Sequence, residues 1–230
     1  MKAVFSFIWK WIKRGVIAFF ALSIFSVLVY RFVPVYITPL MLLRSASQLI
    51  HGEHVRIKKT WEPLDKISPN LELAVFCSED QDFFSHHGFN FEAIKSAWKH
   101  DERSKRLRGA STISQQTAKN VFLTANRSWL RKGFEAYFTV LIEFIWGKRR
   151  IMEVYLNVVE LGKGIYGAEA ASEFYFSKHA KELTPAEAAS LAAILPDPLK
   201  WSPVNSGPYV TERRQWILDQ MANYGQIPVK

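Results

Sequence analysis

The longest apolar stretch of the chain lies near its N-terminus. Sixteen residues from Gly15 to Tyr30 carry no charge, and apolar residues continue beyond Arg31. A helix needs about 20 mainly apolar residues to cross the hydrocarbon core of a bilayer. The stretch Ile12–Val33 is long enough if the Arg31 side chain reaches the interface. The pattern therefore predicts one transmembrane helix, which we place at residues 15–34.

Basic residues on one side of this segment predict its orientation. Lysine and arginine mark the cytoplasmic side of a membrane span, and the residues concerned are Lys2, Lys10, Lys13 and Arg14. We therefore expect residues 1–14 in the cytoplasm and the rest of the chain outside. A cleaved signal peptide is the alternative, but the apolar run ends in Tyr-Arg-Phe-Val-Pro rather than in the small residues of a cleavage site.

A second apolar stretch, Val35–Leu43, follows the predicted span. Pro34 and Pro39 make it a poor continuation of the same helix. It suits the outer membrane–water boundary and, equally, packing against a globular domain. We assign residues 35–60 to a juxtamembrane segment and residues 61–230 to the globular domain.

Helical periodicity and helix caps dominate the globular domain. Ser128 is a good N-cap, Gly147 is a stop signal, and Thr184, Pro185 and Glu187 form a capping box with proline at the first helical position. Alternation typical of strands is nearly absent, apart from a short extended piece around residues 55–60. The predicted fold class is mainly α, with helices over residues 128–147, 150–159, 184–195 and 209–222.

Composition supports a folded chain of one domain plus an appendage. The 230 residues are 49% hydrophobic and 14% aromatic, which excludes a disordered protein. Cys77 is the only cysteine, so an intramolecular disulfide is excluded. We expect Cys77 to be a small, packed side chain.

The net charge of +9 comes almost entirely from one block. Residues 95–132 hold ten Lys/Arg against two Asp/Glu, whereas the flanking parts hold ten against eight and ten against eleven. Such a block implies an anionic partner, which can be nucleic acid, anionic lipid or a phosphorylated substrate. For Lys99–Arg108 alone, a solvated basic loop is the simpler interpretation.

Three carboxylates lie within four residues, at Glu79, Asp80 and Asp82. Their repulsion predicts that at least one has a raised pKa, suited to proton transfer near neutral pH, but the sequence alone does not choose among them. An apolar run just before Glu79 suggests a buried helix end that delivers it to a cleft. The alternatives are a polar helix terminus with exposed acids, and a metal site of Asp82 with His86 and His87, although adjacent histidines rarely bind one ion.

A second polar segment, Arg108–Asn120, contains small residues followed by polar side chains at helical spacing. Small residues at a helix start expose backbone N–H groups, which suit an anion or a sugar hydroxyl. The alternative is an ordinary polar helix face, but few acidic residues lie nearby in sequence to pair with its donors. These donors are Gln115, Gln116 and Lys119.

A third segment, Arg127–Glu135, places cations near the start of the helix predicted from Ser128. Arg131 and Glu135 are one turn apart, and an exposed ion pair at this spacing contributes only about 0.3–0.5 kcal/mol. The functional alternative is a carboxylate among phosphate-binding cations. The spacing does not decide between the two.

Together these segments resemble successive signatures of the peptidoglycan glycosyltransferases of family 51. The resemblance extends from the apolar segment to about Met221, and the chain then ends without a transpeptidase domain, as in monofunctional members from Gram-negative bacteria. The matching residues are Glu79-Asp80-x-x-Phe83-x-x-His86-x-Gly88, Gly109-Ala110-Ser111-Thr112-Ile113-Ser114-Gln115-Gln116 with Lys119-Asn120, Arg131-Lys132-x-x-Glu135, Glu153-x-Tyr155-Leu156-Asn157, and Glu187-Ala188-Ala189-x-Leu191 running to Pro198.

The resemblance implies a lysozyme-like, two-lobed helical domain with a cleft near the membrane. It implies that Glu79 is the base that deprotonates the 4-hydroxyl of N-acetylglucosamine in incoming lipid II. That hydroxyl then attacks the terminal N-acetylmuramic acid of the growing strand, with inversion, and releases undecaprenyl diphosphate. A second catalytic carboxylate is Glu135, which with Lys119 and Arg127 occupies the family's positions around the diphosphate.

Other site residues also come from the resemblance. It implies that Ser111, Gln116, Asn120, Arg131 and Lys132 bind substrate. Residues that support the base are Asp80, Phe83, His86 and Gly88. The sequence departs from many members in having Gly109-Ala110 for Gly-Gly and Cys77 before the base, and neither change alters a charged role.

The resemblance also implies the setting of the enzyme. We expect an inner-membrane protein with a periplasmic catalytic domain, acting on lipid II and the lipid-linked strand, with cell-wall synthesis proteins as partners and no nucleic acid. No cofactor is required and the chain has no self-contained metal motif, although Mg²⁺ or Mn²⁺ can assist the diphosphate. Two rivals are a muramidase with Glu79 as general acid and a non-enzymatic anchored scaffold that binds anions through residues 95–132.

Overall fold

A computed structural model describes residues 2–92, 95, 111–124 and 128–227, without the side chains of residues 2–5. The chain divides into two compact units, residues 1–34 and residues 35–230.

The first unit is a single helix, α1 (Lys2–Phe32). Its stretch Ser6–Phe32 has a mean hydropathy of 2.0 and is long and apolar enough to cross a membrane. The helix ends shortly before Pro34, as expected because the residue before a proline avoids the α conformation. The domain boundaries at residues 14, 34 and 60 stay predictions.

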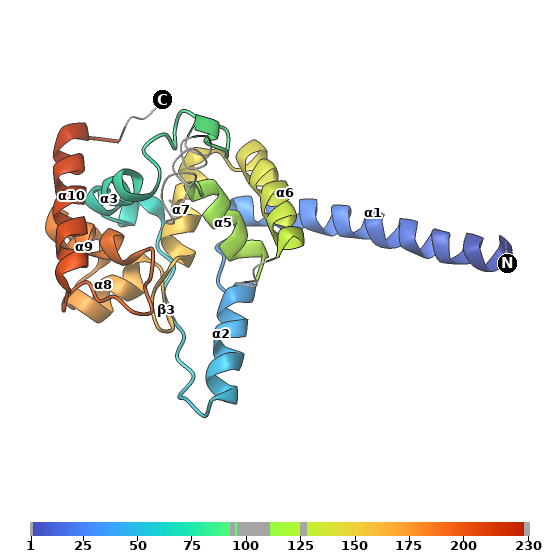
Figure 1. Ribbon diagram of the computed structural model, residues 1–230, viewed down its shortest axis with the longest axis horizontal. Coiled ribbons are helices and arrows are strands. Elements are labelled where there is room, and N and C mark those ends of the chain that lie inside the picture. The colour runs from blue at the N-terminus through green and yellow to red at the C-terminus, as the bar shows by residue number, and fades with distance from the viewer. Residues whose placement is uncertain (1, 93–94, 96–110, 125–127, 228–230) are drawn as a thin grey trace. The chain divides into compact units, whose positions relative to one another are not determined.

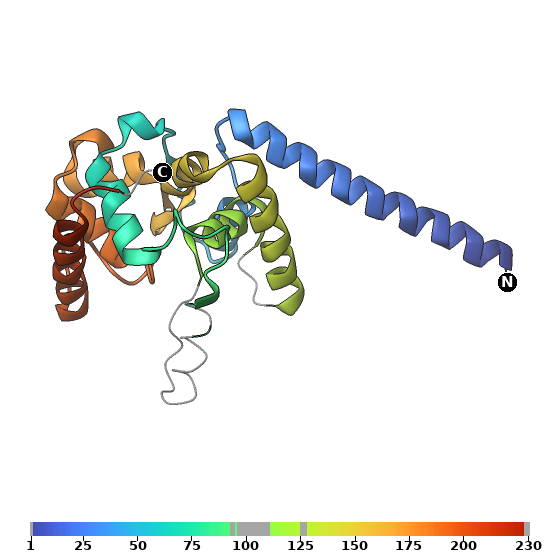
Figure 2. The same ribbon diagram turned by 90° about the horizontal axis from the view of Figure 1, so that it is seen from above.

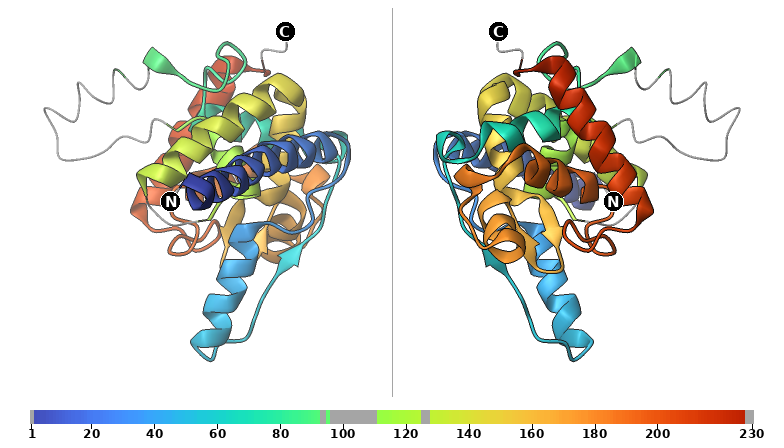
Figure 3. Two further views of the ribbon diagram at one scale, coloured as in Figure 1. Left: turned by 90° about the vertical axis from the view of Figure 1, so that its right-hand side faces the viewer. Right: turned by 90° about the vertical axis from the view of Figure 1, so that its left-hand side faces the viewer.

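The second unit opens with α2 (Pro39–Ile50), which begins with proline after the N-cap Thr38. Met41 and Gln48 are buried on one face of α2, whereas Leu42 and Leu49 are exposed. Figure 3 shows α2 projecting from the helical body and the chain returning to β1 (Lys58–Lys59).

One helix group consists of α3 (Pro69–Glu79), α9 (Pro185–Ile194) and α10 (Pro208–Tyr224), which pack against one another (Figure 1). Four alanines of α9 are fully buried, namely Ala188, Ala189, Ala192 and Ala193, and their small size lets the neighbouring helices approach closely. A short 3₁₀ helix, η1 (Leu64–Lys66), precedes α3.

A second helix group consists of α5 (Ile113–Phe122), α6 (Trp129–Ile145) and α7 (Lys148–Val158). The helix α5 packs against both α6 and α7 (Figure 2). The rings of Phe122 and Phe138 stack with centroids 4.4 Å apart, which fixes α5 on α6.

A small sheet completes the domain, with the order β1-β3-β2. The strands β2 (Glu160–Gly162) and β3 (Ile165–Tyr166) pair antiparallel, and β1 pairs parallel with β3. Gly164 lies at φ +71° in the turn, and a Cβ there would lie 2.1 Å from the Arg56 carbonyl oxygen, so only glycine fits. The helices α8 (Ala168–Phe176) and η2 (Ala180–Glu182) follow.

The predicted helices are confirmed, with small shifts at their ends. Ser128 caps α6, the capping box of Thr184 and Glu187 opens α9, and Gly225 ends α10. The extended piece near residues 55–60 becomes only the two-residue strand β1. Cys77 is buried as expected, and burial raises the pKa of its thiol to about 11.

Candidate functional site

The helix α3 carries Glu79 as its last residue. Ser68 caps the start of α3, and its hydroxyl also donates to the Leu183 carbonyl oxygen at 2.9 Å. The apolar run before Glu79 is buried, so the position of this helix end is fixed by packing at both termini. The predicted delivery of Glu79 by a buried helix is confirmed.

The Glu79 carboxylate lies between the two helix groups. Gln116 of α5 donates to Glu79 Oε2 at 3.0 Å, and Arg213 of α10 donates to Glu79 Oε1 at 3.3 Å. Gln116 is itself held by the buried Tyr155 of α7, whose hydroxyl donates to Gln116 Oε1 at 3.2 Å. Three helices therefore position one carboxylate.

Burial is the main cause that raises the pKa of Glu79. The hydrogen bond from Gln116 and the charge and hydrogen bond of Arg213 lower this pKa, and the neighbouring charge of Asp80 raises it by a smaller amount. The expectation of a raised pKa among the three acids thus holds for Glu79, but repulsion is the minor cause. A carboxylate with a raised pKa accepts a proton more readily than an exposed one.

Asp80 is buried and serves the local structure. Its Oδ2 accepts the backbone N–H of Ile113 at 3.0 Å, and both of its oxygens lie 3.0 Å from His86 Nε2. His86 Nδ1 accepts the Gly88 N–H at 3.0 Å, which assigns the His86 proton to Nε2. Asp80 and His86 therefore join the end of α3 to the start of α5.

These contacts occupy part of the predicted anion site at the start of α5. Three backbone N–H groups there already have partners within the protein, because Asp80 accepts from Ile113, Thr112 Oγ1 accepts from Gln115, and Gln115 Oε1 accepts from Thr112. Gln115 is accordingly a buried capping residue and does not belong to the binding surface. These N–H groups were expected to be free for substrate because the sequence does not reveal their acceptors. One acceptor, Asp80, lies far away along the chain, and the others belong to the capping box.

Phe83 and Gly88 support this junction. Phe83 is fully buried, and the Lys148 ammonium lies 4.6 Å from the centroid of its ring. Gly88 has φ +89°, and a Cβ there would lie 2.8 Å from the Thr139 methyl group of α6. Only glycine fits this close approach to α6.

A cavity of about 390 Å³ adjoins Glu79 through Gln116, which contributes to its wall. The predicted residues Lys119, Asn120 and Arg131 line the same cavity. Other lining residues come from α2, the sheet and the segment after α9, and include Arg44, Glu160 and Pro196. Three cations from separate helices thus converge on one space.

Glu135 lies at the edge of this cationic region and is buried. Arg131 donates to its Oε2 at 2.6 Å, and Lys132 forms an ion pair with its Oε1. The ion pair considered from the sequence is therefore present and is shielded from water. The Arg131 Nε is buried and lacks a hydrogen-bond partner within the described residues.

Burial also lowers the pKa of Lys119, the cation nearest to Gln116 along α5. The charge of Glu135 raises this pKa, while Arg131 and Lys132 lower it. No hydrogen bond or ion pair joins Lys119 to another side chain in the part of the chain described here. Its ammonium can therefore bind a ligand without first leaving a protein partner.

Several predicted residues stand apart from this arrangement. Arg127 is one of six among the ten Lys/Arg of the basic block over residues 95–132 that lie outside the described residues. Ser111 is exposed just before α5. Asp82 is exposed and accepts from Asn90 at 2.7 Å while His86 binds Asp80, so the alternative metal site of Asp82 with the two histidines is not assembled.

Sequence reasoning missed Arg213, Arg44 and Glu160. Arg44 Nε lies 3.4 Å from Glu160 Oε2, and Tyr166 donates to Glu160 Oε1 at 3.2 Å. Burial raises the pKa of Glu160, and Arg44 lowers it. No local pattern pointed to these residues, because each acts on a group far away along the chain.

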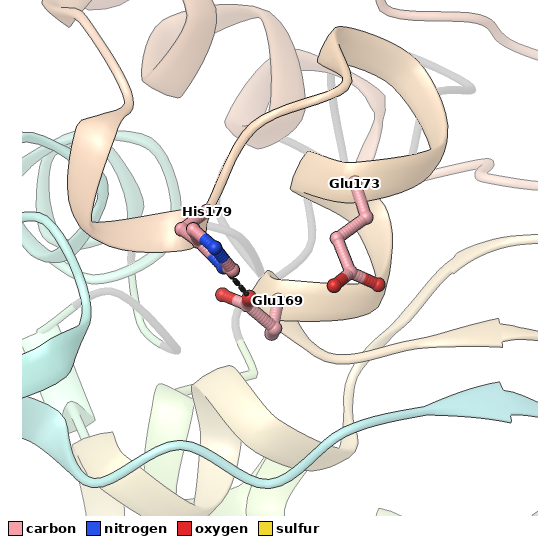
Figure 4. A group of neighbouring side chains, drawn as sticks. All are labelled: Glu169, Glu173 and His179. Carbon is pink, nitrogen blue, oxygen red and sulfur yellow. Dashed lines mark hydrogen bonds and ion pairs between the residues drawn. The ribbon is translucent and has the colours of Figure 1, made fainter.

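One group of side chains in the described residues has the spacing of a cation site. Ligand atoms of Glu169, Glu173 and His179 lie within 4.8 Å of one another (Figure 4). Glu169 is buried and already has partners on both oxygens, since it accepts the Ala180 N–H at 2.7 Å and lies 2.7 Å from His179 Nδ1. Its contacts tie η2 to α8, and we assign no metal to them.

Comparison with known proteins places this site in a family. A family model described as Transglycosylase matches residues 46–222. A biosynthetic peptidoglycan transglycosylase from Bdellovibrio bacteriovorus is 53% identical over 213 residues, which cover 93% of this chain and 85% of that protein. A protein of the same name from Bacteroides thetaiotaomicron is 51% identical and covers 95% of this chain and 88% of its own length.

A third relative of that name, from Chromohalobacter salexigens, is 48% identical over 94% of this chain and 95% of its own length. The matched region contains the helix end with Glu79, the whole of α5 and α6, and the cavity residues from Arg131 to Pro198. This chain therefore belongs to the transglycosylase family, whose mainly helical, lysozyme-like domain it carries, and it is a peptidoglycan glycosyltransferase.

Proposed function

We propose that this enzyme polymerises lipid II into linear glycan strands, with Glu79 as the general base. The 4-hydroxyl of N-acetylglucosamine in the incoming lipid II attacks the anomeric carbon of N-acetylmuramic acid at the lipid-linked end of the strand. A new C–O bond forms on one face of the sugar while the bond to the diphosphate breaks on the other, so the configuration inverts. The hydroxyl proton passes to Glu79, and undecaprenyl diphosphate leaves with the electron pair.

The observation that carries this proposal is the closeness of the base to the cationic cavity. Gln116 donates to Glu79 and also lines the cavity that Lys119 and Arg131 share. A diphosphate gains negative charge as the glycosidic bond breaks, so fixed cations stabilise the transition state more than the ground state. A muramidase has no comparable use for cations beside its acid.

Glu135 acts in this proposal as an organiser of the cations. Arg131 and Lys132 each contact one of its oxygens, which holds both side chains near the expected place of the diphosphate. The enzyme needs no cofactor, and a bound Mg²⁺ or Mn²⁺ would supply positive charge to the diphosphate. Because the Glu135 oxygens are occupied by cations, such a metal would bind mainly through the substrate.

The membrane setting follows from the substrate. Lipid II keeps its polyprenyl tail in the bilayer, and α1 provides one candidate span. We place this span in the bacterial inner membrane with residues 1–14 in the cytoplasm and the catalytic domain in the periplasm. Proteins of cell-wall synthesis are the partners expected there, and nucleic acid is not.

Incubation of the purified full-length protein with labelled lipid II in detergent tests the proposal against its rivals. The expected product is a polymer that lysozyme digests, formed with and without EDTA. A muramidase would instead shorten preformed strands, and an anchored scaffold would leave lipid II unchanged. Either of those results contradicts the proposed function.

A further inference from the structure

We propose that Arg213 is a positioning residue for glycosyl transfer. Its guanidinium contacts both the backbone at the end of α3 and the Glu79 carboxylate, and it thereby fixes the base in its working orientation. The inference rests on the proposed role of Glu79. Arg213 lies in α10, outside every motif that suggested the function, and 134 residues from Glu79.

The contact geometry supports an orienting role. Arg213 Nη2 lies 3.3 Å from Glu79 Oε1 and 3.4 Å from the Ser78 carbonyl oxygen, so one nitrogen contacts both the base and the helix that carries it. Gln116 holds the other carboxylate oxygen at 3.0 Å. Each oxygen has two lone pairs, so these two donors prevent rotation of the carboxylate and still leave positions that accept a proton.

The charges around Glu79 give Arg213 a second effect. Asp80, which directly follows α3, disfavours an ionised Glu79, whereas Arg213 on α10 favours it. Lys119 of α5 and Tyr155 of α7 also interact electrostatically with Glu79. The remaining neighbour of α3, the helix α9, has only Glu187 as a titratable group, and that residue is paired with Lys178.

Among the described residues, Arg213 is therefore the one cation in direct contact with the base. Burial raises the pKa of Glu79, and Arg213 opposes that rise. Removal of the guanidinium should raise the pKa further. A protonated Glu79 cannot accept the substrate proton, so activity should then be lost first at acidic pH.

The attachment of α10 does not depend on this contact. Val210, Ile217 and Met221 are the buried residues that pack α10 against its neighbours. Arg213 is part-exposed, with 22% of its side-chain surface accessible. Its substitution therefore tests the base while leaving the apolar contacts of the helix in place.

The test is the pH dependence of single-turnover polymerisation in full-length Arg213→Gln and Arg213→Met. In both variants the acidic side of the pH–rate profile should move to higher pH by about one unit. At pH values below the pKa of Glu79, this corresponds to a tenfold lower ionised fraction of the base. Arg213→Lys keeps the charge and should shift the limb less. Arg214→Gln is the matched control, because it removes the same charge from the next residue, which makes no hydrogen bond or ion pair with Glu79 in the described structure.

Acid limbs of Arg213→Gln and Arg213→Met that coincide with that of Arg214→Gln would overturn the inference, as would an equal loss of rate at every pH. Thermal unfolding of each variant shows whether it folds. If Arg213→Gln fails to fold, Arg213→Met serves in its place, because methionine keeps most of the length of the arginine side chain. Glu79→Gln is measured alongside. If it polymerises at the wild-type rate, the proposed function fails, whereas an inactive Glu79→Gln with an unmoved Arg213→Gln profile refutes only the role of Arg213.

Discussion

At the residue scale, burial acts on two oppositely charged groups of one site. It raises the pKa of Glu79 and lowers the pKa of Lys119. Glu79 is therefore protonated at a higher pH than an ordinary glutamate, and the Lys119 ammonium loses its charge at a lower pH than an ordinary lysine. The proposed mechanism needs an ionised Glu79 and a charged Lys119, so these two pKa shifts should narrow the active pH range from both the acidic and the alkaline side.

Lys119→Ala should lower single-turnover polymerisation about ten- to a hundredfold, because it removes a charge-assisted contact of about 1.5–3 kcal/mol. Lys119→Arg should keep part of the rate and extend activity to higher pH, since a guanidinium stays charged at pH values where a lysine amine loses its proton. Rates measured between pH 5 and 10 test both statements. Turnover of Lys119→Ala at the wild-type level would refute its role at the diphosphate.

Arg127→Ala tests the role predicted for Arg127 in the same assay.

At the element scale, local signals predicted the helices, and long-range contacts determine the site. The capping residues Ser128 and Thr184 lie within four residues of the groups they bind, so these caps can be recognised from the sequence. The strands β1, β2 and β3 have only two or three residues each, which is too short for an alternating pattern.

The chemistry at the junction of α3 and α5 was less predictable. The resemblance supplied Glu79 and Asp80, but the capping of α5 by Asp80 joins residues 33 positions apart. The contact of Arg213 with Glu79 depends on how α10 packs on α3, which no local pattern encodes. Packing of distant elements therefore decides which of several polar residues reaches Glu79.

The helix α3 contains a second perturbed carboxylate, Glu72, whose pKa burial raises from 4.5 to about 7. Below pH 4.5 the group is protonated in the folded and unfolded states, so its burial cost is absent. As the pH rises from 4.5 through 7, the group ionises and stability is lost. Glu72→Gln should therefore be more stable than the wild type by about 1–3 kcal/mol at pH 8 and equally stable at pH 4.5.

Thermal unfolding of the purified protein in detergent at the two pH values measures this difference. Glu212→Gln, which changes an exposed carboxylate of α10, is the control and should have no such effect. If Glu72→Gln loses stability at pH 8, the Glu72 carboxylate is stabilising and its burial is not the dominant influence.

At the scale of the whole molecule, one unit suits a bilayer and the other holds the site. The helix α1 exposes large apolar side chains along most of its length, as a lipid-facing helix does. Basic residues precede its apolar part, and the catalytic domain follows it. In the proposed setting, α1 anchors the enzyme in the membrane that holds the lipid tail of its substrate.

Alkaline phosphatase fused after Lys230 should be active in cells, because the proposed orientation places the C-terminus in the periplasm. The same enzyme fused after Arg14, without the apolar span, should be inactive. Phosphatase activity and protein levels are measured together. A well-expressed but inactive Lys230 fusion would contradict the orientation.

The central claim is that Glu79 takes the proton of the attacking hydroxyl, and Glu79→Gln tests it most directly. Glutamine keeps the size and hydrogen-bonding capacity of the side chain but is not basic, so binding of lipid II should survive while single-turnover polymerisation is almost abolished. Asp80→Asn and Asp82→Asn should each retain more activity than Glu79→Gln. Glu135→Gln should also lose activity, but its defect should depend more on added divalent metal than that of Glu79→Gln. A Glu79→Gln rate above a few per cent of the wild type, or a larger loss in either aspartate variant, would show that another group is the base.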